Sequence, residues 1–327
     1  MIENLYFRMK ARSLIGLVVL ILISLSATYA GTKSQKRLRR DFCKLKFGMF
    51  IHFNMGTFHE KEWVEPGQDP HSFNPAKLDC YQWADAAKSA HMKYAVLTTK
   101  HHDGFCLWDS KTTTYDVASS AIAGRDVVRE FCEAFRSRGI EPHFYFSIWD
   151  RTMGIEKELH PKDLIIIKEQ LKELLTNYGK IGSITFDGWG NCGTVWKQSD
   201  RDEIYNYVKS LQPELLITDH YQLRRGLPQD SVYKNVDFFH YEEPWNDEWA
   251  PPGNKYAAQQ GPIIQSAWFW KQKFPKEKLM SVDNIVNRHL AILKKRNCNF
   301  LLNCAPNRNG LMDDNVVNRL AEVGKEY

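Results

Sequence analysis

After about residue 41, short apolar runs alternate with longer amphipathic segments to the end of the chain. A short apolar run between turn residues is typical of a buried strand, and apolar residues three or four apart are typical of a helix packed on a sheet. Strands that alternate with helices form a parallel sheet, because each helix returns the chain to the start of the next strand. The predicted strands are 47–53, 94–98, 141–148, 183–186, 215–218, 236–239, 263–269 and 300–304.

Eight strands, most of them followed by a helix, predict a closed barrel rather than an open sheet. The strands and helices occupy roughly 280 residues, which is close to the usual size of a (β/α)8 barrel. No change in composition marks a second domain, so we expect an α/β fold consisting of one TIM-like barrel over 41–327. The predicted helices are 79–90, 125–138, 162–178, 201–211, 282–295 and 315–325.

The N-terminal segment is predicted to be removed from the mature protein. A basic start at 9–12 precedes an apolar run at 14–25 that is too short to span a bilayer comfortably. Small residues two apart, ending at Ala30, suit a signal peptidase. We therefore interpret 1–30 as tag-like residues, including a protease-site-like stretch at 3–7, and a signal peptide cleaved after Ala30. The protein would then be secreted or periplasmic, without membrane contact; an uncleaved anchor is the alternative.

Charge and cysteine content exclude several other classes of protein. The basic residues of 31–40 are interpreted as a solvated leader into the barrel. Without residues 1–30 the formal net charge of +5 falls to +3, which is too small to indicate nucleic-acid binding. The seven cysteines leave at least one thiol unpaired and include no Cys-x-x-Cys pair, which excludes a zinc ribbon. With 43% hydrophobic and 25% charged residues, the chain is not disordered.

Ionisable and aromatic residues gather where the predicted strands end. His52 lies at the end of the first strand, KHHDGF at 100–105 follows the second, and WDR at 149–151 follows the third. DGW at 187–189 follows the fourth strand, and HYEE at 240–243 follows the sixth. The active site of such a barrel lies at the carboxyl ends of its strands. These residues therefore predict an enzyme.

Two chemistries fit these residue types. Metal-assisted hydrolysis would use His52, His101, His102 and Asp187 as ligands. Neighbouring histidines at a strand end tend to diverge, however, and the first strand offers no His-x-His pair. Glycoside hydrolysis needs two carboxyl groups, with imidazoles and indoles to hold the sugar. Asp187 ends an apolar strand at the barrel rim and is well placed as a nucleophile, although an Asp before Gly taken alone is more typical of an ordinary turn or helix cap.

Specific motifs run through most of the chain. The most distinctive is YAVLTTKHHDGFCLW at 94–108, which contains the Lys-His-His-Asp-Gly-Phe run. Together with the motifs that follow, it resembles glycoside hydrolase family 29, the α-L-fucosidases, over nearly the whole mature chain. The other segments are KFGMFIHF at 46–53, EW at 62–63, YDV at 115–117, GRDVV at 124–128, FYFSIWD at 144–150, ITFDG at 184–188 and NFLLNCAPNRNG at 299–310.

The resemblance implies a retaining exo-glycosidase on a (β/α)8 barrel, here without the C-terminal β-sandwich of many members. Asp187 would be the nucleophile that forms a covalent fucosyl-enzyme, and a second carboxylic acid would protonate the leaving oxygen. No cofactor or metal is implied. The residues that would bind the fucose hydroxyls and ring are His52, Glu62, Trp63, His101, His102, Tyr145 and Trp268.

The sequence departs from the family pattern at two places. Thr185 stands where the family usually has a Trp two residues before the nucleophile. Gln259 and Gln260 stand where members with a similar Trp-Phe-Trp motif have the catalytic Glu. A Gln cannot donate a proton as an acid, so we assign the acid/base to Glu243, with Glu242 as the alternative.

These arguments predict a secreted α-L-fucosidase that acts on fucosylated oligosaccharides or glycoconjugates. The alternatives are a related barrel glycosidase with another sugar specificity, and a fucose-binding barrel whose acid/base is lost or displaced. The histidines expected to be structural or on the surface are His91, His143, His160, His220 and His289.

Overall fold

Eight parallel strands form a single sheet in the computed structural model, which describes residues 33–190, 193–195, 197–220, 236–242 and 249–327. Their order is β5-β4-β3-β2-β1-β8-β7-β6, so the first and last strands of the chain are neighbours. The strands are β1 (Phe47–Ile51), β2 (Tyr94–Lys100), β3 (Glu141–Ser147), β4 (Ser183–Asp187), β5 (Leu216–Asp219), β6 (Phe239–Glu242), β7 (Ala258–Gly261) and β8 (Cys298–Asn303).

The sheet curls into a nearly closed barrel. Its outer strands β5 and β6 meet through the residues that precede β6: Asp237 N donates to Ile217 O at 2.8 Å, and Thr218 Oγ1 donates to Phe238 O at 2.6 Å. The predicted (β/α)8-type barrel is therefore confirmed.

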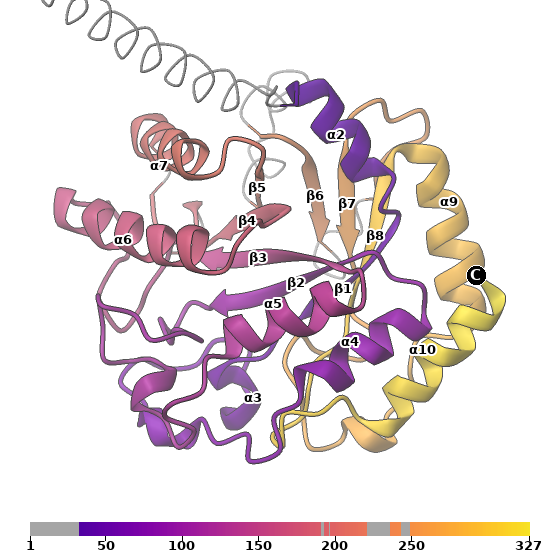
Figure 1. Ribbon diagram of the computed structural model, residues 1–327, viewed down its shortest axis with the longest axis horizontal. Helices are drawn as coiled ribbons and strands as arrows, with labels where there is room; N and C mark the ends of the chain where they lie inside the picture. The colour runs from indigo at the N-terminus through magenta and orange to yellow at the C-terminus, as the bar shows by residue number, and fades with distance from the viewer. Residues whose placement is uncertain (1–32, 191–192, 196, 221–235, 243–248) are drawn as a thin grey trace, which may run out of the picture.

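Helices cover the outside of the barrel (Figure 1). Two of them begin at an acidic cap: Asp79 accepts from two backbone N–H groups of α4, and Asp126 accepts from one of α5. The α-helices are α2 (Gln35–Cys43), α3 (Met55–His59), α4 (Cys80–Ser89), α5 (Val127–Ser137), α6 (Pro161–Asn177), α7 (Gln198–Leu211), α9 (Ala291–Leu293) and α10 (Asp314–Glu326). The 3₁₀-helices are η1 (Pro70–Ser72), η2 (Val117–Ser119), η5 (Phe274–Lys276) and η7 (Lys294–Arg296), and η6 (Asn284–Leu290) is a π-helix.

The strands are buried on both faces. Every residue of β1, β2 and β8 is buried, because helices cover the outer side chains while the inner side chains fill the barrel. This double burial explains why most strands appear in the sequence as continuous apolar runs. Six of the eight predicted strands agree with the observed bounds to within two residues.

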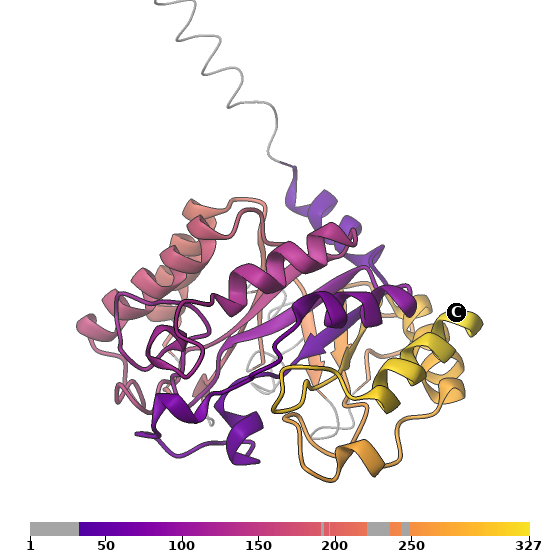
Figure 2. The ribbon, with the colours of Figure 1, turned by 60° about the horizontal axis from the view of Figure 1, so that its bottom comes forward.

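Helix α2 closes the amino end of the barrel, and α3 lies at the opposite end (Figures 1 and 2). Leu38 and Phe42 of α2 are buried, and the Phe42 ring lies 4.3 Å from that of Phe238. Asn299 Nδ2 of β8 donates to Phe42 O at 2.8 Å. The segment predicted as a solvated leader over 31–40 thus includes the start of a packed helix, and the predicted boundary at residue 41 falls inside it.

Two strand predictions differ from the structure. Strand β6 lies three residues beyond the predicted 236–239, and β7 lies before the predicted 263–269. The strand β7 has the sequence Ala-Gln-Gln-Gly, which no apolar pattern would identify. It is buried nevertheless, because Gln259 finds hydrogen-bond partners inside the barrel.

The segment predicted as one helix over 282–295 is helical but changes type along its length. It runs through η6, α9 and η7 and ends at Asn297, whose φ of 48° lies in the left-handed region that Asn tolerates. Its last turn carries three basic side chains, which suit the negative end of a helix.

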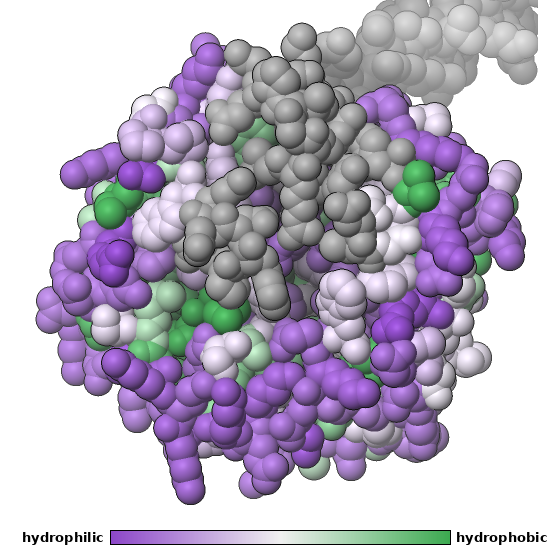
Figure 3. Space-filling model, turned by 180° about the vertical axis from the view of Figure 1, so that it is seen from behind, coloured by the Kyte–Doolittle hydropathy of each residue, from purple (hydrophilic) through white to green (hydrophobic). Residues whose placement is uncertain are grey.

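The surface that the structure describes carries few large apolar groups. Figure 3 shows a mostly hydrophilic face, with a small group of hydrophobic residues beside the grey atoms. In the described ranges, no helix is long and apolar enough to cross a membrane. Each of the six cysteines that the structure describes is a free thiol, and Cys192 lies outside the described residues.

Candidate active site

Asp187 is the last residue of β4, and its carboxylate lies at the carboxyl end of the barrel. Tyr145 Oη donates to Asp187 Oδ2 at 2.8 Å, and the backbone N of Gly188 donates to Oδ1 at 2.7 Å. Gly188 has a φ of +79°, and a Cβ there would lie 2.6 Å from that of Trp149. A glycine is therefore required directly after Asp187, and this turn presents the carboxylate to the site.

Three histidines that follow the ends of β1 and β2 lie on one side of this carboxylate. His102 Nε2 lies 3.7 Å from Asp187 Oδ2. The ring of His101 stacks on Tyr145 at 5.7 Å, and the ring of His52 lies 6.1 Å from that of His101. The adjacent histidines of the second strand end thus both reach the site, because a turn rather than a regular strand follows Lys100.

Two of these imidazoles are oriented by side chains behind them. Ser147 Oγ donates to a backbone carbonyl, so it accepts from His102 Nδ1 at 2.7 Å. Asn303 Nδ2 also donates to a backbone carbonyl, so its Oδ1 accepts from His52 Nδ1 at 2.7 Å. Both rings therefore carry a proton on Nδ1, and Nε2 of the neutral ring is an acceptor.

Burial and charge set the protonation states of this group. Burial lowers the pKa of His52 to about 3, although the hydrogen bond with Asn303 opposes that change. Burial also lowers the pKa values of His101 and His102. For Asp187, burial raises the pKa, but the nearby imidazoles, Tyr145 and Gly188 N outweigh burial and hold it well below its usual range. Asp187 is therefore an ionised carboxylate in the folded protein.

Glu62 and Trp268 lie on the β1 side of the site. Trp268 N donates to Glu62 Oε2 at 3.2 Å, and the Trp268 ring lies 4.8 Å from that of His52. Lys271 Nζ lies 3.4 Å from Glu62 Oε1. Burial raises the pKa of Glu62, and Lys271 opposes that rise. The Glu62 carboxyl group is thus held by partners on the loop after β7.

Trp63 is the exposed aromatic group at the rim, with 51% of its surface accessible. Its ring meets that of His102 edge-on at 5.8 Å and that of Trp149 at 5.5 Å. An exposed indole beside buried imidazoles provides an apolar surface next to hydrogen-bonding groups, as sugar sites require.

A second carboxylate lies across the site from Asp187. Glu242 is the last residue of β6, and its Oε2 lies 3.5 Å from His220 Nδ1. The same His220 nitrogen lies 3.5 Å from Asp187 Oδ2, so His220 stands between the two carboxylates. Glu243, the residue first assigned as acid/base, lies outside the described residues.

The structure brings together every described residue that was predicted for the site, and adds four more. His220 was expected to be structural, but it follows β5 directly and contacts both carboxylates. His220 lies two residues after the predicted fifth strand, and a histidine at a strand end is the same signal that identified His52. Ser147, Asn303 and Lys271 are ordinary polar residues in sequence, and only their contacts reveal what they do.

The positions that depart from the family pattern are all buried on strands of the barrel. Gln259 and Gln260 are fully buried in β7, below the rim where a proton donor would meet a substrate. Thr185 is fully buried on β4, two residues before Asp187, and its hydroxyl has no hydrogen-bond partner among the described residues.

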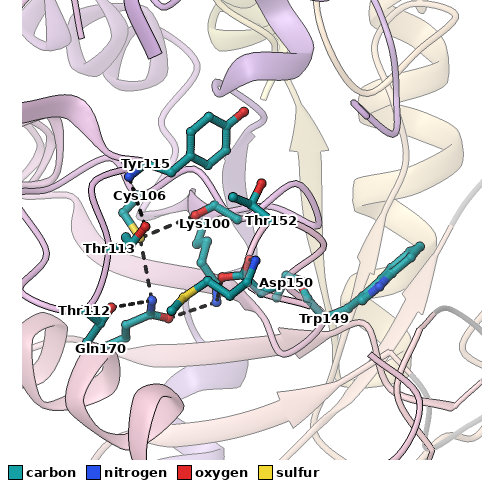
Figure 4. Close-up of polar contacts among 12 residues, drawn as sticks. Lys100, Cys106, Thr112, Thr113, Tyr115, Trp149, Asp150, Thr152 and Gln170 are labelled. Carbon is teal, nitrogen blue, oxygen red and sulfur yellow. Dashed lines mark hydrogen bonds and ion pairs between the residues drawn. The ribbon is translucent and has the colours of Figure 1, made fainter. Parts of the chain in front are cut away.

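A buried ion pair supports the turn that carries the two adjacent histidines (Figure 4). Lys100 Nζ lies 3.1 Å from Asp150 Oδ2 and donates to Gln170 Oε1 at 2.9 Å. Arg151 N donates to His102 O at 2.9 Å, which ties the loop after β3 to the loop after β2. The two loops are therefore held together behind the site.

The metal alternative can be compared with this geometry. Within the ranges that the structure describes, no group of three or more His, Cys, Asp or Glu side chains is arranged to hold a metal ion. Nδ1 of His52 and Nδ1 of His102 are each engaged with a neighbouring side chain.

The chain was compared with known proteins. A family model described as "Alpha-L-fucosidase" matches residues 25–326. Alpha-L-fucosidase 1 of Arabidopsis thaliana is 32% identical over 294 residues, which cover 85% of this chain and 57% of that protein. Tissue alpha-L-fucosidase of Homo sapiens is 24% identical over 319 residues, covering 87% and 66%. The chain thus spans little more than half the length of the plant relative.

Solved structures agree with these sequence matches. Alpha-L-fucosidase isoenzyme 1 from Paenibacillus thiaminolyticus superposes with a TM-score of 0.72 at 29% identity, covering 90% of this chain and 76% of that one. A putative alpha-L-fucosidase from Bacteroides ovatus also gives a TM-score of 0.72, at 26% identity, covering 88% and 54%. On these matches and the site described above, the chain belongs to the α-L-fucosidase family, glycoside hydrolase family 29.

Proposed function

We propose that this chain is an α-L-fucosidase that hydrolyses terminal α-L-fucose from glycans by a retaining double displacement. The observation that carries the proposal is the surroundings of Asp187, an ionised carboxylate at a strand end that faces imidazoles and a phenol. Asp187 would attack the anomeric carbon of fucose, and the resulting ester would then be hydrolysed by water.

The acid/base would come from the end of β6. His220 Nδ1 lies 3.5 Å from one oxygen of each carboxylate, so the Asp187 and Glu242 oxygens are at most about 7 Å apart. Retaining pairs have carboxyl groups about 5–5.5 Å apart, which supports Glu242 as a candidate. Glu243 is the other candidate for the acid/base. A variant of each residue distinguishes the two.

The remaining residues would bind the sugar. Fucose has several hydroxyls and one apolar methyl group, so its site needs fixed donors and acceptors together with an aromatic wall. The imidazoles and Glu62 would bind the hydroxyls. Trp63 and Trp268 would provide the aromatic surfaces, Trp63 from its exposed position at the rim.

The deciding experiment measures release of the aryl group from an aryl α-L-fucoside by the wild type and by Asp187→Asn. We expect turnover by the wild type and a loss of at least about a thousand-fold in the variant, because the nucleophile is removed. Proton NMR of the first product would show the α anomer if configuration is retained. Fucose binding by the variant, measured by calorimetry, is the control for an intact site.

Three other outcomes would contradict the proposal. A first product with the β anomer would replace double displacement by inversion. Fucose binding without turnover in the wild type would favour a binding barrel without a working acid. Turnover of another aryl glycoside but not the fucoside would favour a different sugar specificity.

The acid/base is tested with Glu242→Ala and Glu243→Ala. Loss of the acid slows substrates with poor leaving groups far more than activated aryl fucosides, and added azide restores turnover by attacking the fucosyl-enzyme. The variant that shows both effects identifies the residue. If neither variant does, the acid is not at the end of β6.

We also propose that the protein is exported, on the basis of the basic and apolar segments at 9–12 and 14–25. N-terminal sequencing of protein recovered from a secreting host should begin at Gly31. A start upstream of the apolar run would contradict cleavage after Ala30.

A further inference from the structure

Gln259 lies in the middle of β7 with its side chain inside the barrel. Its Nε2 lies 2.7 Å from His240 Nδ1, and its Oε1 accepts from Tyr94 Oη at 3.4 Å. Burial keeps the pKa of the Tyr94 phenol well above its usual range, so the hydroxyl keeps the proton that it donates to Gln259 Oε1. The amide oxygen therefore faces Tyr94, and the amide N–H group donates to His240.

This hydrogen bond determines the state of His240. A nitrogen that accepts from an amide N–H cannot itself carry a proton, so Nδ1 of His240 is the unprotonated nitrogen. The ring is then neutral, with its proton on Nε2. A charged His240 would point a second N–H group at the amide of Gln259, and that contact is repulsive.

His240 in turn lies against His220. The two rings are parallel, with an interplanar angle of 3° and centroids 4.2 Å apart. Two imidazoles stacked so closely, inside a barrel, do not both carry a positive charge, because burial strengthens the repulsion between like charges. A neutral His240 leaves His220 as the ring of this pair that can be protonated.

His220 also has the partners that a charged imidazole requires. Its Nδ1 lies 3.5 Å from Asp187 Oδ2 on β4 and 3.5 Å from Glu242 Oε2 on β6. From β3, the Tyr145 ring lies 6.0 Å from that of His220. His52, which follows β1, and His101 and His102, which follow β2, also act on it, and burial lowers the pKa of each.

We propose that Gln259 is a positioning residue for the acid–base chemistry: by donating to His240 it keeps that ring neutral, so that His220 holds the proton between Asp187 and Glu242. The proposal rests on the proposed function for its catalytic meaning, but the protonation states can be measured without turnover. It also explains why an amide suits this buried position. A carboxylate at 259 would accept a proton from His240 and favour its charged form.

The first test is direct and uses the wild type. In protein labelled with ¹⁵N-histidine, the nitrogen signals report which ring atoms carry protons, and His240→Gln and His220→Gln assign them. We expect His240 to have an unprotonated Nδ1 between pH 5 and 8, and His220 to be protonated on both nitrogens through at least the lower part of that range. A protonated His240 Nδ1 in the wild type would overturn the proposal.

The second test places a carboxylate beside His240. Gln259→Glu should protonate His240 Nδ1 and move the loss of the His220 proton to lower pH, by about one pH unit. The alkaline limb of the pH profile of kcat/KM for an aryl fucoside should also move to lower pH. Gln260→Glu is the matched control, because it adds a buried carboxylate to the same strand on the opposite face. It should leave the His240 signals unchanged.

The outcomes separate this proposal from the proposed function. If Gln259→Glu alters neither the His240 signals nor the pH at which His220 loses its proton, Gln259 does not set the charge of the pair. Gln259→Met, which removes the donor without adding charge, provides the same NMR readout if Gln259→Glu does not fold. If no form of the protein turns over a fucoside, the NMR results still decide the role of Gln259.

Discussion

Two groups of charged side chains at the carboxyl end of the barrel are built in opposite ways: Lys100 with Asp150, and His220 with Asp187 and Glu242. The Lys100–Asp150 pair has no accessible side-chain surface, and its atoms are 3.1 Å apart. His220 contacts Asp187 and Glu242 at 3.5 Å each, and these two carboxylate side chains retain 14% and 15% of their surface. The Lys100–Asp150 pair is sealed from solvent, whereas the carboxylates beside His220 border the solvent that a substrate would displace.

The difference matches what each group can do. The ammonium of Lys100 also donates to Gln170 and lies 4.4 Å from the Phe146 ring, so its charge is fully enclosed. A sealed pair holds two loops in one arrangement, because losing either charge would leave the other buried without a partner. A single proton between two partly accessible carboxylates can instead be given up and regained, as acid–base catalysis requires.

The largest effect should follow from breaking the sealed pair. Lys100→Met leaves the Asp150 carboxylate buried without its cation, so we expect the free energy of unfolding to fall by about 3–5 kcal/mol. Urea denaturation followed by circular dichroism measures this loss. The double variant with Asp150→Asn should regain most of it, because Asn still accepts from Met153 N, as Asp150 does at 2.9 Å. A loss below about 1 kcal/mol would mean that the pair is not essential to the turn.

Asp103, in the turn beside the sealed pair, should make stability depend on pH. Burial raises the pKa of Asp103 to about 7, and the charge of Asp150 adds to that rise. The folded state thus keeps a proton that the unfolded chain loses near pH 4, so this group's contribution to stability falls as pH rises from about 4 to 7.

Asp103→Asn should remove that dependence. At pH 8 the variant should be more stable than the wild type by roughly 2–4 kcal/mol, and near pH 4 the two should be equal. Thermal unfolding across this pH range measures the difference. Asp109→Asn, at a side chain with 62% exposure, is the control. A difference at Asp103 that does not change with pH would show that its carboxyl group is ionised throughout.

A smaller effect, on activity rather than stability, is expected at His220, between Asp187 and Glu242. His220→Gln should lower kcat/KM by about 10–100-fold and alter the alkaline limb of its pH profile. The reason is that an amide cannot bind and release a proton between the two carboxylates. His143→Gln is the matched control, since His143 is a fully buried histidine of β3 whose Nδ1 contacts Ser183. It should reduce stability but leave the pH profile in place. Equal pH profiles for the two variants would contradict the role of His220.

The fold was largely predictable because its signals are local. Apolar runs mark the strands that are buried by helices outside and side chains inside, as in β2 and β8. The prediction failed for β7, where Gln259 and Gln260 are buried through side-chain contacts that no periodicity reveals. The solvated leader predicted over 31–40 did not anticipate that α2 begins at Gln35 and buries Leu38 against the end of the barrel.

The site was predictable where a residue type follows a strand end, as with Asp187, and less so where a neighbour sets its chemistry. His102 carries its proton on Nδ1 because Ser147 accepts it, and no feature of either residue's sequence context reports that contact. His220 follows a strand end as His52 does, so the sequence carried the same signal for both histidines.

The sequence by itself determined the barrel and the family, because strand and helix periods and the Lys-His-His-Asp-Gly-Phe run are written in consecutive residues. Only the tertiary structure decided which ionisable groups meet. The order of the strands places His220 between Asp187 and Glu242, and barrel closure sets Gln259 against His240. The charge of an ionisable group depends on its burial and on the partners within a few ångströms, and those partners come from distant parts of the chain.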